Sequence, residues 1–153
     1  MEPPAGYTAF CNTVDHGCAV DFQPGGEVRE ATAAAMAALF NANRAINATI
    51  APSTDRRDEW REDARFGDCE DFALAKRRFL MARGWRADQL LLAIGAAPGG
   101  AAHAVLIART SLGDFILDSR SDHVAPWSET DLKWIARQSA RLPAVWVRLA
   151  GDD

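Results

Sequence analysis

The chain has 153 residues, of which 48% are hydrophobic and 25% charged, as in an ordinary globular domain. This length suits one hydrophobic core, so we expect residues 1–153 to form a single domain. The net charge of -4 and the lack of a basic run exclude a typical nucleic-acid-binding surface, and no apolar run approaches the roughly 20 residues that membrane insertion requires.

The first segment, residues 1–26, is rich in proline and glycine, which predicts irregular structure. Its start lacks the basic and apolar regions of a signal peptide, so we expect a cytosolic protein or a mature chain. Cys11 and Cys18 lie close together while Cys69 stands alone. This spacing fits one local disulfide and one free thiol, although three reduced, buried cysteines fit the composition equally well.

Helical spacing of apolar residues extends from about Glu27 to Ile50 and predicts the first helix. Three asparagines interrupt it, at Asn41, Asn43 and Asn47. Asparagine competes with the helical backbone for hydrogen bonds, so we expect a bend or break near them.

A second helix is predicted from Cys69 to Arg83, after a polar loop at residues 52–66. Asp68 is placed to cap this helix with Asp71 as its partner, and Gly84 provides a left-handed stop. The basic residues of the helix fall mostly outside its apolar face: Lys76, Arg77 and Arg78.

Beyond the second helix the apolar pattern becomes extended. Residues 90–94 predict a buried strand, and residues 103–109 and 115–118 predict a hairpin. Alternation along the first hairpin strand places His103 on one face with Val105 and Ile107. A last strand is expected at residues 145–149.

Ser128 with Asp131 resembles a capping box, which predicts a short helix through Trp134 and Ile135. The order of elements is therefore helices first and strands afterwards. Such segregation predicts an α+β domain, in which N-terminal helices pack on a small antiparallel sheet.

The predicted start of the second helix places Cys69 among carboxylates. A thiol attacks only as thiolate, and a helix N-terminus lowers the pKa of a cysteine. The neighbouring carboxylates oppose ionisation, since like charges disfavour each other: Asp68, Glu70 and Asp71. Either a protonated His103 outweighs them, or a cation neutralises them, or the thiol is a structural one.

His103 and Asp118 lie on the two strands of the predicted hairpin, where facing residues are close together. His103 could accept the thiol proton of Cys69, and Asp118 could fix the tautomer of His103. The three residues thus comprise a nucleophile, its base and the group that orients the base. Singly, each has a simpler role as a buried thiol, a strand-edge histidine or a turn cap.

The run Gly67-Asp68-Cys69-Glu70-Asp71-Phe72-Ala73 resembles the signature of the bacterial transglutaminase-like cysteine peptidases. His103-Ala104-Val105-Leu106 and Gly113-Asp114-Phe115-Ile116-Leu117-Asp118 resemble the His and Asp blocks of that family. The resemblance covers nearly the whole chain and implies a papain-like or transglutaminase-like fold. It also implies a cysteine endopeptidase that acts through an acyl-enzyme, without an organic cofactor.

Carried over residue by residue, the resemblance makes Cys69 the nucleophile, His103 the general base and acid, and Asp118 the orienting carboxylate. Asp68 and Glu70 match positions that the LapG-type branch of the family associates with calcium. Hard oxygen ligands suit Ca²⁺, although two carboxylates supply only part of a shell of about six to eight oxygens. A helix cap alone is the simpler role of Asp68.

The same resemblance implies a periplasmic or secreted location, with which a Cys11–Cys18 disulfide would agree. In the LapG-type branch the substrate is a protein, a large surface adhesin, and a membrane receptor that reads a cyclic dinucleotide is the partner. Two other functions fit the residues: acyl transfer to an amine, and a non-catalytic calcium-dependent binding module with the same fold.

Overall fold

The structure is a computed structural model that describes residues 3–13, 27–52, 66–141 and 145–149. Its helices are α1 (Ala5–Thr13), α2 (Ala33–Thr49), α3 (Cys69–Met81) and the 3-10 helices η1 (Ala87–Gln89) and η2 (Trp127–Glu129). Its strands are β1 (Ala51–Pro52), β2 (Phe66–Gly67), β3 (Leu90–Ala96), β4 (Ala102–Thr110), β5 (Gly113–Leu117), β6 (Ala125–Pro126), β7 (Lys133–Gln138) and β8 (Trp146–Arg148).

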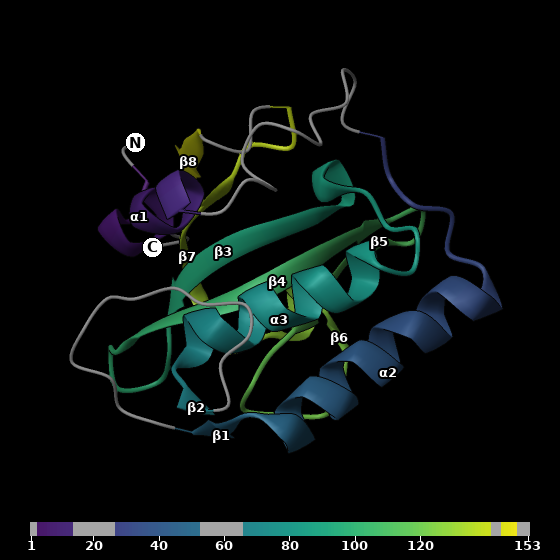
Figure 1. Cartoon of the computed structure of the whole chain (residues 1–153), viewed down its shortest axis with the longest axis horizontal. Helices are drawn as coiled ribbons and strands as arrows, with labels where there is room; N and C mark the ends of the chain where they lie inside the picture. The colour runs from purple at the N-terminus through teal and green to yellow at the C-terminus, as the bar shows by residue number, and fades with distance from the viewer. Residues whose placement is uncertain (1–2, 14–26, 53–65, 142–144, 150–153) are drawn as a thin grey trace.

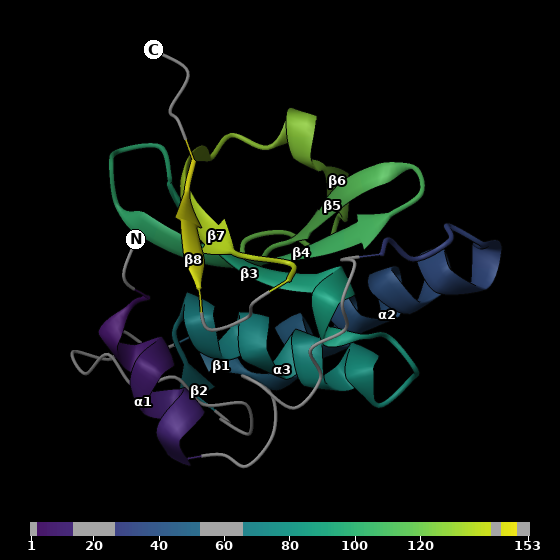
Figure 2. The ribbon, with the colours of Figure 1, turned by 90° about the horizontal axis from the view of Figure 1, so that it is seen from above.

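An antiparallel sheet forms one layer, with the strand order β6-β5-β4-β3-β7-β8. The helices α2 and α3 cover one face of this sheet, as the two views in Figure 1 and Figure 2 show. Strands β1 and β2 form a separate parallel pair at the end of α3 where that helix begins. The predicted α+β class, with N-terminal helices packed on a small antiparallel sheet, is confirmed.

The core lies between the helices and the sheet. Leu39 of α2, Leu74 of α3 and Leu106 of β4 are fully buried in one cluster there. The other face of β4 carries Val105 and Ile107, which belong to a second cluster. The predicted alternation along β4 is therefore correct, because a side chain on each successive residue points to the opposite face.

The predicted start of α3 is confirmed, and its end lies two residues before the predicted Arg83. Asp68 is the N-cap, and its N–H donates to Oδ2 of Asp71 at 3.1 Å within a capping box. The helix ends at Met81, and Gly84 follows with a φ of 93°, a conformation that glycine adopts without strain. The structure thus fixes Cys69 as the first residue of a well-capped helix.

Two expectations for the basic residues and the N-terminus are wrong. Lys76 and Arg77 are buried, although we expected them outside the apolar face of α3. Residues 5–13, expected to be irregular, form α1, since Pro3 and Pro4 lie before the helix, where proline is tolerated. Cys18 and nearly all of the predicted loop at residues 52–66 lie outside the described residues, so the Cys11–Cys18 disulfide stays a prediction.

The first predicted helix is wrong in its start and in its expected break. It begins at Ala33 because Oγ1 of Thr32 accepts the N–H of Ala35 at 3.1 Å. It then continues without a break through the asparagines, because Asn43 and Asn47 direct their amides to a distant segment. Their side chains therefore do not compete with the backbone of their own helix.

The short helix predicted through Trp134 and Ile135 is also wrong. Those residues lie in β7, which pairs antiparallel with β3. Asp131 does not cap a helix because Arg120 binds its carboxylate at 2.7 Å. Among the described helices, none is long and apolar enough to cross a bilayer.

Replacing Gly95 by alanine tests the close packing of β3 against the segment that enters β7. An added Cβ would lie 3.0 Å from Cβ of Leu132 and 3.2 Å from the carbonyl oxygen of Lys133. We expect Gly95→Ala to lower the free energy of unfolding by about 1–3 kcal/mol, measured by urea denaturation. Ala102→Ser on the exposed start of β4 is the control, and equal midpoints for the two variants would contradict this packing.

Candidate active site

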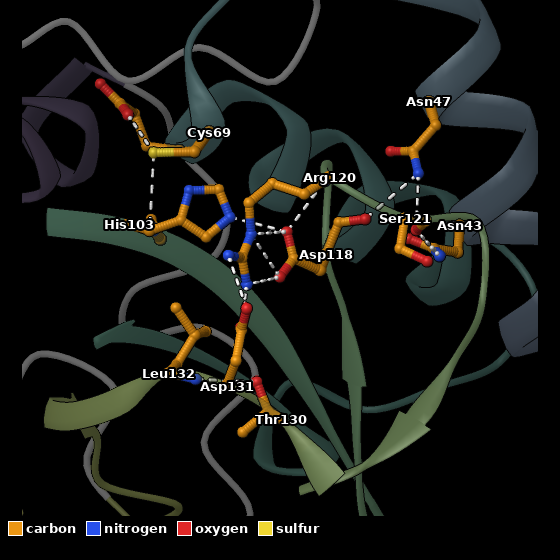
Figure 3. A network of polar contacts seen from close by, with 12 residues as sticks. Asn43, Asn47, Cys69, His103, Asp118, Arg120, Ser121, Thr130, Asp131 and Leu132 are labelled. Atoms are coloured by element: carbon orange, nitrogen blue, oxygen red, sulfur yellow. Dashed lines mark hydrogen bonds and ion pairs between the residues drawn. The ribbon is translucent and has the colours of Figure 1, made fainter. Parts of the chain in front are cut away.

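Three elements bring the predicted Cys, His and Asp together (Figure 3). Cys69 is the first residue of α3, His103 lies near the start of β4, and Asp118 directly follows β5. The His103 ring lies between the side chains of the other two residues in Figure 3. The backbone N–H of Ala104 donates to Cys69 Sγ at 3.3 Å and joins the start of α3 to β4.

The hydrogen bond between His103 Nε2 and Asp118 Oδ1 is 2.7 Å long. The β4–β5 register, in which Leu106 pairs with Leu117, makes this bond possible. His103, three residues before Leu106, and Asp118, one residue after Leu117, both point to the face of the sheet opposite to these leucines. An ionised carboxylate only accepts hydrogen bonds, so Nε2 carries a hydrogen here. In the neutral ring, Nδ1 is then the nitrogen able to accept a proton.

Arg120 holds the carboxylate of Asp118 from the other side. Its Nη2 donates to Oδ2 of Asp118 at 2.7 Å, and its backbone N–H donates to Oδ1 at 2.9 Å. Nη2 also reaches Oδ1 of Asp131 at 2.7 Å. Burial alone would raise the pKa of Asp118, but the hydrogen bonds from His103 and Arg120 hold that pKa well below its ordinary value.

The sequence did not indicate Arg120 or its link to Asp131. Arg120 lies after β5, outside any helix or strand, so neither helical nor strand periodicity marks it. Its spacing of two residues from Asp118 is the one local sign, since such neighbours can share a turn. Asp131, which we expected to partner Ser128 in a capping box, instead completes this chain of ion pairs.

The thiol of Cys69 is partly buried and donates to Oε2 of Glu70 at 3.3 Å. Burial raises the pKa of Cys69 to about 12, the N–H of Ala104 lowers it, and the Glu70 carboxylate raises it. The thiol is therefore protonated at pH 7 in this arrangement. Burial and the Glu70 carboxylate therefore outweigh the backbone N–H groups of Ala104 and Glu70, which lower the pKa of Cys69.

The two predicted metal ligands, Asp68 and Glu70, lie on either side of Cys69 in the chain. Burial raises the pKa of Glu70, and the charges of Asp68 and Asp71 raise it further. Hard carboxylate oxygens at a point of excess negative charge suit a calcium ion. Within the described ranges, however, no group of three or more His, Cys, Asp or Glu side chains could hold a metal. Asp68 and Glu70 thus fit calcium only as part of a ligand set.

Two cavities lie next to the ion pairs that Arg120 forms with Asp118 and Asp131. One has a volume of about 350 Å³ and is lined by residues that include Asp118, Arg120 and Asp131. The other, of about 230 Å³, is lined by the β3–β4 turn at residues 97–100 and again by Asp131. Asp131 thus lines both cavities.

Comparison with known proteins gives a family and similar structures. A family model described as bacterial transglutaminase-like cysteine proteinase matches residues 1–153. A search of curated proteins found no match. The structure of Legionella pneumophila LapG is similar, with a TM-score of 0.65 and 28% sequence identity over 77% of this chain and 71% of that chain.

Two further structures of Legionella pneumophila LapG are similar to this chain. The calcium-bound one has a TM-score of 0.63 and 27% identity over 80% of this chain and 75% of that chain. The EGTA-treated one has a TM-score of 0.61 and 30% identity over 69% of this chain and 64% of that chain. The sequence and the fold of this chain therefore point to the same group of proteins.

Replacing Arg120 by glutamine tests the hold on Asp118. We expect Arg120→Gln to lower the free energy of unfolding by about 1 kcal/mol at pH 7. The effect is small because solvent screens the ion pair of a side chain that is 35% exposed. The pKa of Asp118 lies below 3.8 in the folded state. The contribution of the ionised Asp118 to the free energy of unfolding is therefore full above pH 3.8 and is lost as the pH falls further. Urea unfolding of both chains should therefore give free energies that converge in acid.

The matched variant is Asp131→Asn, which removes only the second partner of Arg120. The free energy of unfolding at pH 7 should fall less in Asp131→Asn than in Arg120→Gln. A larger loss would mean that Asp131, and not Asp118, is the partner that matters for stability.

Proposed function

This chain belongs to the bacterial transglutaminase-like cysteine proteinase family and is a cysteine peptidase, and on that premise we propose that Cys69, His103 and Asp118 are its catalytic triad. The observation that carries the proposal is the 2.7 Å bond from His103 to Asp118, with Cys69 on the other side of the ring. This order of nucleophile, base and orienting carboxylate is what acyl transfer from a peptide requires.

The first half-reaction forms an acyl-enzyme. His103 Nδ1 takes the proton of Cys69, and Sγ attacks the carbonyl carbon of the scissile peptide bond. Backbone N–H groups at the start of α3 stabilise the oxyanion, except those of Asp71 and Phe72, which donate to the carbonyl oxygen of Asp68. The protonated His103 then gives its proton to the leaving amine, and a thioester of Cys69 remains.

The second half-reaction releases the acyl group. His103 takes a proton from water, the resulting hydroxide attacks the thioester, and the thiol of Cys69 is restored as the acid product leaves. Asp118 stays ionised throughout, because its pKa is depressed, and it keeps the hydrogen on Nε2. An amine in place of water would give a transfer product instead.

The resting thiol donates to Glu70, and this contact bears on activation. Sγ has to leave Oε2 of Glu70 before His103 can take its proton. Neutralising the carboxylates beside Cys69 would favour that change, because their charge opposes the thiolate. We propose that Asp68 and Glu70 supply oxygen ligands to a calcium ion, whose charge would neutralise these carboxylates. The calcium-bound LapG structure supports the binding of calcium by analogy.

The substrate and location follow from the family resemblance. We propose that the substrate is a protein, of the class of large surface adhesins, and that cleavage takes place in the periplasm or outside the cell. A membrane receptor is the proposed regulatory partner. The two cavities support a peptide as substrate, since the one lined by Asp118 and Arg120 adjoins the proposed triad and both share Asp131.

The pH dependence of Cys69 alkylation by iodoacetamide, mapped by mass spectrometry, tests the triad. In saturating Ca²⁺ we expect the wild-type chain to react well below pH 8, and His103→Ala to lose about a hundredfold of that rate at pH 7. Without Ca²⁺ the reaction should be slow at the same pH, because burial and Glu70 raise the pKa of Cys69 to about 12. His123→Ala, in the loop after β5, is the control and should react like the wild type. A rate that is independent of His103 would contradict the proposal.

Cleavage products then separate hydrolysis from acyl transfer. With a cleavable substrate, Cys69→Ala should abolish turnover. Mass spectrometry with an added primary amine should show the free acid as the main product, and an amide as the main product would favour acyl transfer.

Calcium titration followed by thermal unfolding tests the metal ligands. We expect saturating Ca²⁺ to raise Tm by several degrees, because a ligand at about 100 times its Kd contributes about 2.7 kcal/mol. Glu70→Gln should remove most of the rise, and Asp114→Asn, on β5, should retain it. An equal rise in Glu70→Gln would place any calcium site elsewhere.

A further inference from the structure

Lys76 is a charged residue of α3 that the proposed mechanism does not use. Its side chain is completely buried, and Nζ makes no hydrogen bond within the part of the chain that the structure describes. The ring of Phe72 is its neighbour on the same helix, with its centroid 5.8 Å from Nζ. An unsatisfied buried ammonium costs stability, so an apolar side chain would be expected at this position if packing alone mattered.

The charges that act on Lys76 come from one segment. They are the carboxylates of Asp118 and Asp122, which raise the pKa of Lys76 against the larger effect of burial. Burial nevertheless lowers that pKa to about 7. The charge of Lys76 therefore interacts with the segment of residues 118–122, whose first residue is the partner of His103.

The helix α2 holds the same segment with neutral amides. Asn47 Nδ2 donates to the carbonyl oxygen of Asp118 at 3.2 Å and to Oδ1 of Asp122 at 3.1 Å. Asn43 Nδ2 donates to the carbonyl oxygen of Ser121 at 2.9 Å, and Figure 3 shows both amides pointing to this segment. Hydrogen bonds from α2 thus hold the segment, and its carboxylates act electrostatically on Lys76 of α3.

We propose that Lys76 is a positioning residue for Asp118, whose charge draws the segment of residues 118–122 into the position where Asp118 meets His103. The inference rests on the proposed role of Asp118. It explains why a buried cation without a hydrogen bond occupies α3, because the stability lost by burying Lys76 is offset by a function in the site. Lys76 acts only through Asp118 and does not touch the substrate.

The sign of the stability effect follows from the pKa of Lys76. Between about pH 7 and the ordinary value of 10.5, the unfolded chain binds more protons than the folded chain, so stability rises with pH. Below pH 7 folding buries the charge at full cost. Lys76→Met should therefore raise Tm at pH 6, and the difference from wild type should shrink towards pH 10.

The decisive measurement is the NMR signal of the His103 Nε2–H proton, assigned by its change in Asp118→Asn. In Lys76→Met we expect this signal to shift upfield and to broaden through exchange with water. Alkylation of Cys69 by iodoacetamide at pH 7 should fall about tenfold or more, as a displaced catalytic group requires. A higher Tm with a weaker His103–Asp118 bond is a combination that a purely structural lysine would not produce.

Arg78→Met is the matched control, since it removes an exposed cation from the same helix, and all its readouts should equal the wild type. Lys76→Gln keeps a polar side chain without the charge, and it should behave like Lys76→Met if either variant folds poorly. An unchanged Nε2–H signal in both Lys76 variants overturns the proposal. Alkylation that does not depend on His103 would instead refute the triad, while the signal would still report whether Lys76 holds Asp118.

Discussion

The hydrogen bond between His103 and Asp118 depends on the antiparallel register of β4 and β5, and the geometry of the site depends on that bond. Register decides which face of the sheet a side chain occupies, because a slip of one residue would turn it to the opposite face. Leu106 and Leu117 are buried against the helices, so a slip would expose apolar area as well as separate His103 from Asp118. Core packing and site geometry are thus fixed by the same pairing.

The start of α3 combines features that oppose each other. The helix N-terminus favours a thiolate, whereas burial and Glu70 raise the pKa of Cys69 to about 12. A protonated thiol at rest is less open to oxidation, since reactivity follows the thiolate. The same carboxylates that suppress the thiolate are the proposed calcium ligands. Calcium binding would then also favour the thiolate of Cys69, because both depend on the charges of the same carboxylates.

Local signals were sufficient to predict α3, its cap and the β4–β5 hairpin. Asp68, Asp71 and Gly84 are close to Cys69 in sequence, and the alternation along β4 needs only a few residues to be recognised. Combined with the family resemblance, these signals led to the three candidate residues of the site. The break expected at the asparagines of α2 was wrong because their partners lie more than 70 residues away.

The same limit applies to the buried and ion-paired charges. The burial of Lys76 is the exception, since Lys76 lies four residues from both Phe72 and Leu80, and helical spacing already places it on the apolar face of α3. Arg120 and Asp131 lie in loops, where no periodicity indicates which charges will meet. Contacts between distant segments, rather than helices or strands, are therefore what the sequence left undetermined.

The contacts of Asn43 and Asn47 with residues 118–122 span 71 to 78 residues of chain. Contacts of such long range are slow to form during folding, because the closure of a long loop costs entropy before the contact is made. We expect residues 118–122 to reach their final position late, after α2 has docked on the β4–β5 hairpin. With the proposed triad, a nascent or partly folded chain would then hold Asp118 loosely and have little peptidase activity, so its neighbours during synthesis would be spared from cleavage.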